Sequence, residues 1–329
     1  MLKRYLAPFA LLMVLSLVLS ACGNSSSEED TTQDGGDNSG DSGSENFEPY
    51  TIEHAMGETT VEEKPERVVI LTNEGTEALL AMGVKPVGAV KSWTGDPWYD
   101  HISDQMEGVE VVGDESNVNI EKILELEPDL IIGNKQRQED IYEKLNKIAP
   151  TIFSEKLRGE WQSNFMTYAE ALNMEDKGQQ LIDEYDQRLN DFADQAGDKL
   201  NQKVSVIRFL PDHVRIYHKD SFSGVILEQI GFERPESQDV NDFMEKATKE
   251  RIPAMDGDVL FYFTYEPGDG AASNLQEEWL NDPLFQNLDV VKSGDVHEVS
   301  DAIWNTAGGY IAANEMVDDL EKYFLENEE

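Results

Sequence analysis

The chain has 329 residues, and its 26 Lys and Arg against 67 Asp and Glu give a formal net charge of −41. This charge excludes nucleic-acid binding through a general basic field, because contacts with phosphate need clustered cations. A hydrophobic fraction of 39% excludes disorder of the whole chain, and a single cysteine excludes an intrachain disulfide.

The N-terminal segment has the pattern of a secretory signal peptide. Two cations and an apolar run at residues 6–19 precede two small residues and Cys22. This pattern resembles a bacterial lipobox, whose cysteine is lipidated and becomes the new N-terminus. We therefore expect a signal peptide at residues 1–21 and a membrane anchor at Cys22. The alternative is a plain signal peptide followed by an incidental cysteine.

The next segment is acidic and polar. Residues 23–50 contain eight acids and no Lys or Arg, with Ser, Gly and Asn between them. Such a segment cannot bury apolar surface, and its charges repel one another. We expect residues 22–50 to form a flexible tether, with an acidic interaction tail as the alternative.

The remaining chain alternates between strand and helix patterns. Apolar runs typical of buried strands lie at residues 67–71, 84–90, 109–112, 129–132, 204–209, 214–217 and 259–263. Helical patterns lie at residues 74–82, 120–126 and 223–230. This alternation predicts parallel sheets covered by helices on both faces.

A long helical stretch divides these elements into two groups. Apolar residues recur at helical spacing from Leu181 to Phe192, and a helix of ~25 residues would span ~37 Å. Each group also contains a glutamate eight residues before an aspartate that begins a strand, at Glu121 and Glu250. We therefore predict two similar lobes joined by one long helix.

The predicted fold class is α/β. It consists of two Rossmann-like lobes at residues 51–165 and 201–329, which are joined by a single backbone helix at residues 166–200. A cleft between lobes is a common place for a ligand, so we expect the binding site there.

These features together resemble the solute-binding lipoproteins of ABC importers that have a single backbone helix. That class captures ferric siderophores, cobalamin, haem or metal ions. The stretches similar to its iron–siderophore branch are Pro-Glu-Arg-Val-Val at 65–69, Asn-Ile-Glu-Lys-Ile at 119–123, Leu-Glu-Pro-Asp-Leu-Ile at 126–131 and Trp-Asn-Thr-Ala-Gly-Gly at 304–309. The strand pair that carries Arg208 and Arg215 looks like the ligand-facing pair of relatives that bind citrate-type or hydroxamate siderophores.

The resemblance implies a receptor and not an enzyme, with no catalytic residues and no cofactor. It implies a monomer on the outer face of the bacterial cytoplasmic membrane, which delivers a ferric siderophore to an ABC permease with a separate ATPase. In that class, one glutamate near the top of each lobe docks with arginines of the permease, and Glu121 and Glu250 match those positions. The alternative is that both acids only stabilise helix N-termini.

The cations of one segment stand out in this acidic chain. Residues 199–219 contain five Lys or Arg and a single acid. Arg208 interrupts an apolar strand, so it has an internal carboxylate partner or faces the cleft, since a buried unpaired arginine would be costly. Arg215 lies on the next strand. Arginine suits an anionic chelate because its planar fork donates two parallel hydrogen bonds to a carboxylate.

Further candidates come from the first lobe and from the aromatic residues. Lys135 and Arg137 follow a strand, and ligands bind at the carboxyl ends of strands in open α/β sheets. Ordinary solvation in a loop is the alternative for both. The aromatic candidates for covering a ligand are Trp93, Trp161, Trp304 and Tyr262, for which packing in the core is the alternative.

Other functions fit the sequence less well. The five histidines form no tight metal-binding pattern, so we expect no direct metal site. Cobalamin or haem on the same scaffold remains an alternative. A tethered hydrolase is disfavoured because the chain has no Gly-x-Ser-x-Gly elbow and no metalloprotease helix. A purely adhesive lipoprotein would not account for the group of cations.

Overall fold

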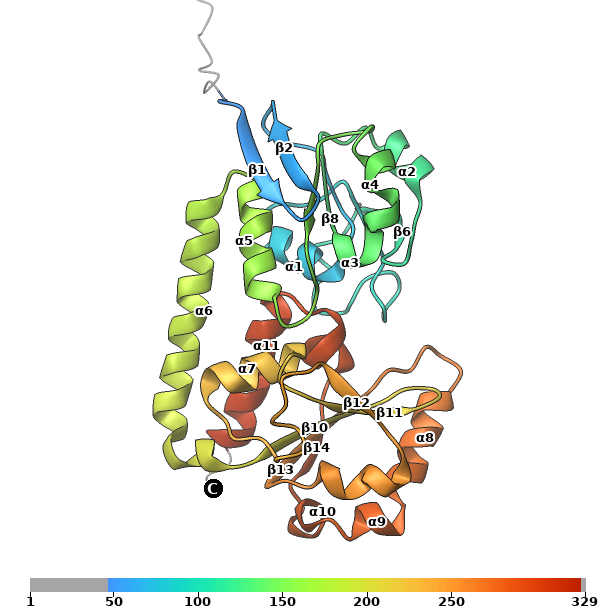
Figure 1. Ribbon diagram of the computed structural model, residues 1–329, viewed down its shortest axis with the longest axis vertical. Helices are drawn as coiled ribbons and strands as arrows, with labels where there is room; N and C mark the ends of the chain where they lie inside the picture. Colours follow the sequence, from blue (N-terminus) through green and yellow to red (C-terminus); the bar gives the residue numbers. More distant parts are fainter. Residues whose placement is uncertain (1–46, 327–329) are drawn as a thin grey trace, which may run out of the picture. The chain divides into compact units, whose positions relative to one another are not determined.

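The computed structural model describes residues 47–326, which belong to one compact unit (Figure 1). Three predictions lie outside the described residues: the signal peptide at residues 1–21, the lipidation of Cys22 and most of the tether. The end of that tether differs from the prediction, because Tyr50 already begins a hairpin. Strand β1 (Tyr50–His54) pairs antiparallel with β2 (Gly57–Val61).

The first lobe contains a five-stranded parallel sheet with the order β5-β4-β3-β8-β9. Its strands are β3 (Val68–Ile70), β4 (Gly88–Ala89), β5 (Glu110–Val111), β8 (Leu130–Asn134) and β9 (Thr151–Ser154). Around it lie α1 (Asn73–Ala81), the hairpin of β6 (Gly113–Asp114) and β7 (Asn117–Val118), α2 (Ile120–Glu125), α3 (Lys135–Gln138), η1 (Glu139–Ile141) and α4 (Tyr142–Leu145). The central strands β3 and β8 are wholly buried, as expected for parallel strands.

The second lobe contains a mixed sheet with the order β12-β11-β10-β13-β14. Its strands are β10 (Val204–Phe209), β11 (Val214–Tyr217), β12 (Met244–Ala247), β13 (Val259–Thr264) and β14 (Val296–Glu298). The pairs β10–β13 and β13–β14 are parallel, whereas β11 pairs antiparallel with both β10 and β12. The other elements are α7 (Phe222–Ile230), η3 (Lys249–Met255), α8 (Ala271–Leu280), α9 (Pro283–Gln286), α10 (Asp289–Ser293) and the π-helical turn η4 (Ala302–Thr306).

A single long helix, α6 (Glu175–Ala196), joins the lobes as predicted, but it is shorter than the predicted span of residues 166–200. A separate helix, α5 (Trp161–Ala171), precedes it, and the turn η2 (Gly197–Asn201) follows it. Asn173 lies between α5 and α6 with a φ of 53°, the left-handed conformation in which asparagine often ends a helix. The 22-residue α6 runs beside both lobes (Figure 1).

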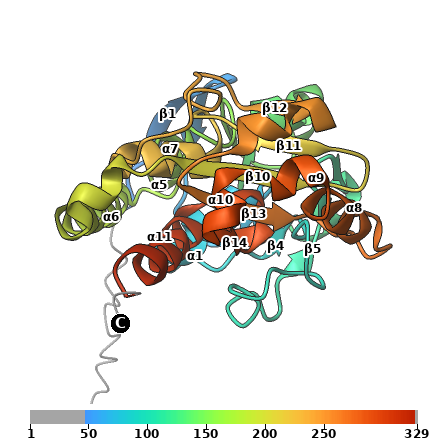
Figure 2. The same ribbon diagram turned by 90° about the horizontal axis from the view of Figure 1, so that it is seen from below.

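Packing joins the lobes in addition to α6. The C-terminal helix α11 (Tyr310–Phe324) contacts α1 and α5 of the first lobe, and it lies on the same side of the molecule as α6 (Figure 2). One apolar core contains residues of both sheets, including Ile70 and Phe261. None of the helices in residues 47–326 has the length and apolarity needed to span a bilayer.

Candidate functional site

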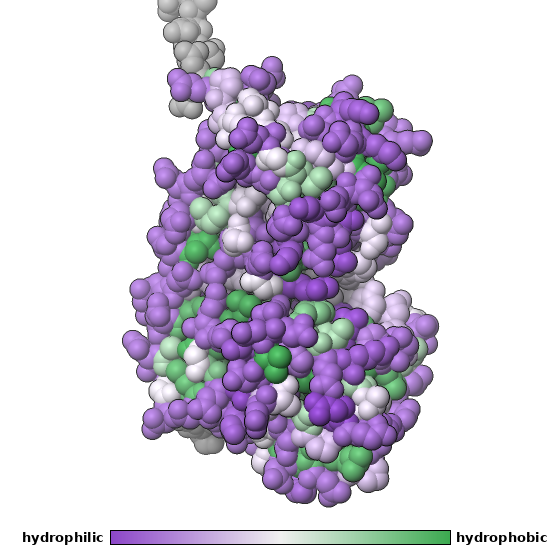
Figure 3. Space-filling view, in the orientation of Figure 1, coloured by the Kyte–Doolittle hydropathy of each residue, from purple (hydrophilic) through white to green (hydrophobic). Residues whose placement is uncertain are grey.

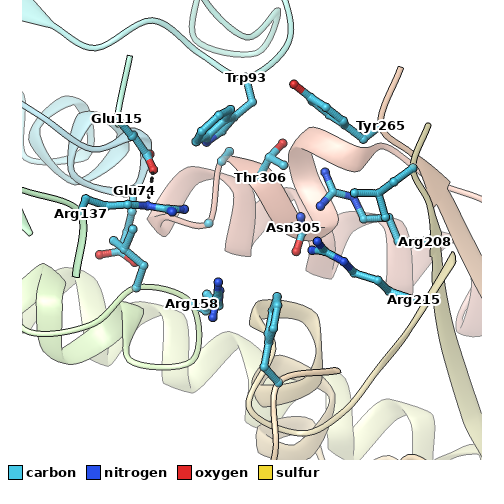
Figure 4. Close-up of a pocket in the computed structure, with 15 residues that line it drawn as sticks. Glu74, Trp93, Glu115, Arg137, Arg158, Arg208, Arg215, Tyr265, Asn305 and Thr306 are labelled. Carbon is cyan, nitrogen blue, oxygen red and sulfur yellow. Dashed lines mark hydrogen bonds and ion pairs between the residues drawn. The ribbon is translucent and has the colours of Figure 1, made fainter. Parts of the chain in front are cut away.

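A cavity of about 250 Å³ lies between the two lobes, where the surface is hollowed (Figure 3). The first lobe and the segment before α5 line it with Glu74, Trp93, Glu115, Arg137, Leu157 and Arg158. The second lobe lines it with Arg208, Leu210, Arg215, Phe243, Tyr265 and residues 305–308. Four arginines from opposite sides therefore converge on one cavity (Figure 4).

Arg208 lies on the buried strand β10 and is only 6% exposed. Its Nε and Nη2 atoms donate to the two carboxylate oxygens of Asp301, at 2.6 and 3.0 Å. Its guanidinium lies 5.1 Å from the centre of the Tyr265 ring. Both predicted possibilities therefore hold for this residue, which has an internal carboxylate partner and also lines the cavity.

Arg137 stands after the carboxyl end of β8. Its Nε donates to Oε2 of the buried Glu115 at 3.2 Å, and its guanidinium lies 5.8 Å from the centre of a Trp93 ring. Oε1 of Glu115 accepts hydrogen bonds from the backbone and the side chain of Asn73, at 2.9 and 2.8 Å. These contacts orient the cation toward the cavity and leave about a third of its side chain exposed.

Arg158 and Arg215 differ from the other two arginines, because neither forms an ion pair with a carboxylate within residues 47–326. Arg215 Nε donates to Nε2 of His213 at 2.9 Å. The guanidinium of Arg158 lies 3.8 Å from the centre of the Phe243 ring, and burial together with Arg137 and Arg215 lowers the pKa of Arg158. Two half-buried cations without counter-charges make the cavity receptive to an anion.

Glu74 is an acid among these cations and is 5% exposed. Its Oε1 accepts hydrogen bonds from Asn164 Nδ2 at 2.8 Å and from the Tyr168 hydroxyl at 3.1 Å. Burial raises the pKa of Glu74 to about 8. The carboxyl group is therefore mostly neutral at pH 7.

Four of the eight predicted ligand contacts line the cavity, namely Arg208, Arg215, Arg137 and Trp93. Lys135 does not line the cavity. It lies two positions before Arg137 on a helix, and side chains at that spacing point about 200° apart. Its Nζ instead pairs with Glu155 at 3.1 Å. Tyr262 also lies outside the cavity, and its hydroxyl donates to Glu298 Oε2 at 3.3 Å.

The other two predicted contacts are core residues. Trp161 is 1% exposed and packs edge-on against the Tyr185 and Phe222 rings. Trp304 is 0% exposed, and its Nε1 donates to Asp319 at 2.8 Å. Both tryptophans therefore occupy the alternative position, packed in the core. Residues 305–308, directly after Trp304, do line the cavity.

Sequence reasoning missed Arg158, Glu74 and the aromatic residues Phe243 and Tyr265. Arg158 follows the strand β9, so the carboxyl-end argument that selected Arg137 could have selected it too. Glu74 lies in the first turn of α1, directly after β3. Phe243 lies in an irregular segment, and no pattern in the sequence marks it.

The two glutamates with expected docking roles lie in separate lobes. Glu121 is in the first turn of α2 and Glu250 is in the first turn of η3, and both are exposed. Hydrogen bonds from Thr248 and from the backbone lower the pKa of Glu250. In the described part of the chain, no group of three or more His, Cys, Asp and Glu side chains could hold a metal ion.

The chain belongs to the periplasmic binding protein family, whose model matches residues 68–302. It is 49% identical to the probable siderophore-binding lipoprotein YfiY of Bacillus subtilis, over 98% of this chain and 99% of that protein. It is 29% identical to the Fe(3+)-citrate-binding protein YfmC of the same organism, over 97% of each chain. Staphylococcus aureus SirA, solved in complex with staphyloferrin B, has 34% identity and a TM-score of 0.78, covering 83% of this chain and 97% of SirA.

Proposed function

We propose that this protein is an extracytoplasmic receptor that binds a ferric siderophore and delivers it to an ABC permease for iron uptake. The observation that carries this proposal is the convergence of four arginines, from both lobes, on one cavity. Relatives named for siderophores and for ferric citrate align with nearly the whole chain. These relatives and the family are binding proteins, so the protein is a carrier and not an enzyme.

The lining of the cavity favours an anionic chelate of the carboxylate or citrate-hydroxamate type. In such a chelate the organic ligand surrounds the iron, so the receptor needs no metal ligands of its own. The guanidinium groups of Arg158 and Arg215 are available to carboxylate oxygens, to which arginine donates paired hydrogen bonds. Trp93, Phe243 and Tyr265 supply flat surfaces for the organic part of the ligand.

The proposed delivery combines attachment to the membrane with a reversible contact with the permease. We propose that residues 1–21 are removed, that lipid on Cys22 anchors the chain, and that residues 22–50 act as the tether. Glu121 and Glu250 then meet arginines of the permease, one from each lobe. Exposed ion pairs are individually weak, which suits a carrier that must dock and leave repeatedly.

A ligand panel tests the proposal. Purified protein is titrated with ferric citrate, the iron complex of staphyloferrin B, a ferric trihydroxamate of zero net charge and cobalamin, with tryptophan fluorescence as the readout. We expect one-to-one quenching by at least one anionic ferric chelate, at concentrations where the neutral complexes cause none. Preference for cobalamin, or absence of quenching by every anionic chelate, would overturn the proposal.

A further inference from the structure

One carboxyl group in the arginine-lined cavity has no role in the function proposed above. Glu115 and Asp301 each neutralise an arginine, but Glu74 forms no ion pair within residues 47–326. It lines the same cavity, on the first-lobe side near Arg137 and Arg158 (Figure 4). An ionised Glu74 would be an unpaired buried charge beside an anionic ligand, and both circumstances are costly.

We propose that Glu74 takes part in capture as a neutral carboxyl group, so that binding of an anionic chelate takes up a proton at this residue when the solution is alkaline. This inference rests on the proposed function and deepens it. Glu74 then determines specificity, because it tolerates an anionic ligand only while its own carboxyl group is protonated.

The hydrogen bonds of Glu74 leave room for this role. Asn164 and Tyr168 both donate to Oε1, and the backbone amide of Arg158 also donates to the carboxyl group. We assign the proton to Oε2, which can donate it to an oxygen of the ligand. Asn164 also donates to the Lys156 carbonyl at 2.6 Å, which fixes the amide in place. The neutral carboxyl group thus has fixed partners on its protein side and a donor for the ligand.

Several charged and titratable groups around Glu74 influence its pKa. Glu115 raises its pKa further, and the backbone amide of Arg158 lowers it, but burial is the dominant cause of the upward shift. Tyr168 stays neutral, because burial and Glu74 raise its pKa well above the ordinary value. Arg137 and Arg158 are the arginines on the same side of the cavity, and Glu77, one turn along α1, is engaged by His101 and by the backbone of Ala312.

The proton balance follows from these directions. In the free protein Glu74 loses its proton as the pH rises past about 8. A bound anion raises the pKa of Glu74 further, so the loaded protein keeps this proton at pH 9 and capture there takes it from the buffer. With half-titration near pH 8 in the free protein, affinity falls about tenfold between pH 7 and pH 9.

The test measures binding of ferric citrate and of the iron complex of staphyloferrin B to the full-length chain between pH 6 and pH 9. Glu74→Gln keeps an acceptor for Asn164 and Tyr168 but cannot titrate. Glu170→Gln makes the same change at an exposed position of α5 and serves as the matched control. Both variants experience the same titration of the chelate itself, so the difference between their profiles isolates Glu74.

We expect the unsubstituted chain and Glu170→Gln to lose affinity about tenfold from pH 7 to pH 9 relative to Glu74→Gln. Calorimetry in buffers of different ionisation enthalpy should show uptake of most of a proton at pH 8.5 by the unsubstituted chain, a measurement that needs no variant. Parallel pH profiles for Glu74→Gln and Glu170→Gln, or no proton uptake at pH 8.5, would overturn the inference. Failure of the unsubstituted chain to bind either chelate at any pH is a distinct result, which overturns the proposed function and this inference with it.

Discussion

Arg208 and Asp301 form a two-pronged ion pair inside the second lobe, with both side chains less than a tenth exposed. Burial lowers the pKa of Arg208, but Tyr217 and Asp301 outweigh burial and the net shift is upward. The same arginine lines the interlobe cavity. Its position in the cavity therefore depends on a counter-charge of its own lobe.

This relationship predicts that Arg208→Ala lowers both stability and affinity. Removal of the cation leaves Asp301 buried and uncompensated, which costs about 3–5 kcal/mol of unfolding free energy. We also expect binding of an anionic ferric chelate to weaken well over tenfold. Urea unfolding and chelate titration measure the two effects. The double variant Arg208→Ala/Asp301→Asn should recover part of the stability but none of the affinity, and a double variant no more stable than Arg208→Ala would contradict the explanation.

Substitution of Arg158 or Arg215 should weaken binding as substitution of Arg208 does, but without the loss of stability. Neither has a carboxylate partner among the described residues, so Arg158→Gln and Arg215→Gln should leave the unfolding free energy unchanged or slightly higher. Each should nevertheless weaken capture of an anionic chelate more than tenfold, or about 1.4 kcal/mol. Lys135→Gln, which removes a cation outside the cavity, is the matched control and should bind normally. Loss of stability equal to that of Arg208→Ala would show that these cations have structural partners.

The sequence was sufficient for the α/β fold class and for the strand that carries Arg208. An apolar run interrupted by a single arginine signals a buried cation, and a buried cation must be paired or must face a cavity. The sequence does not show toward which side a given side chain points. Lys135 and Arg137 follow the same strand, yet only Arg137 lines the cavity, because the turn of a short helix separates them.

The tryptophans and the N-terminal bound of the connecting helix show the same limit. Trp304 precedes a stretch rich in small residues, and the structure places those residues at the cavity but the indole in the core. The break between α5 and α6 depends on one left-handed residue, Asn173, within a pattern that is otherwise helical on both sides. Such features are fixed by tertiary packing, which local periodicity does not encode.

Trp93 should report ligand binding. Among the tryptophans of the described residues, only Trp93 lines the cavity, so Trp93→Phe should remove the largest share of the fluorescence quenching caused by a ferric chelate. Trp98→Phe, a buried neighbour in the same loop, is the matched control and should keep most of it. If the two variants lost equal shares of the quenching, the ligand would not contact the Trp93 side of the cavity.

The docking glutamates should affect transport without affecting capture. Glu121→Gln/Glu250→Gln is expected to bind the chelate with unchanged affinity and to abolish uptake of radioactive iron by cells that rely on this receptor. Glu143→Gln/Glu236→Gln places the same two charge changes at other exposed positions, one in each lobe, and should transport normally. Normal uptake by the first double variant would remove both residues from the contact with the permease.

His101 and Glu77 should make stability depend on pH. Glu77 is 0% exposed and accepts hydrogen bonds from His101 Nε2 at 2.5 Å and from the backbone of Ala312 at 2.9 Å. Burial lowers the pKa of His101, but Glu77 outweighs burial and the net shift is upward. The pair therefore stabilises the fold fully below pH ~6.5, and this stability is lost as the pH rises through the raised pKa.

Urea unfolding between pH 5.5 and pH 9 measures this dependence. Glu74 also lowers the unfolding free energy as the pH rises to about 8, because the folded chain keeps a proton there that the unfolded chain has lost. The comparison with His101→Gln is therefore the informative quantity. We expect the unsubstituted chain to lose more unfolding free energy over this range than His101→Gln does. Identical losses in the two proteins would mean that His101 stays neutral beside Glu77.

The location of the iron tests the central claim most directly. Crystals of the protein loaded with an anionic ferric chelate, measured at the iron absorption edge, give the metal position by anomalous scattering. We predict one iron site per chain in the cavity between the lobes, with the chelate oxygens in contact with Arg158 and Arg215. An iron site outside this cavity, or a chelate in the cavity that contacts none of its four arginines, would contradict the account.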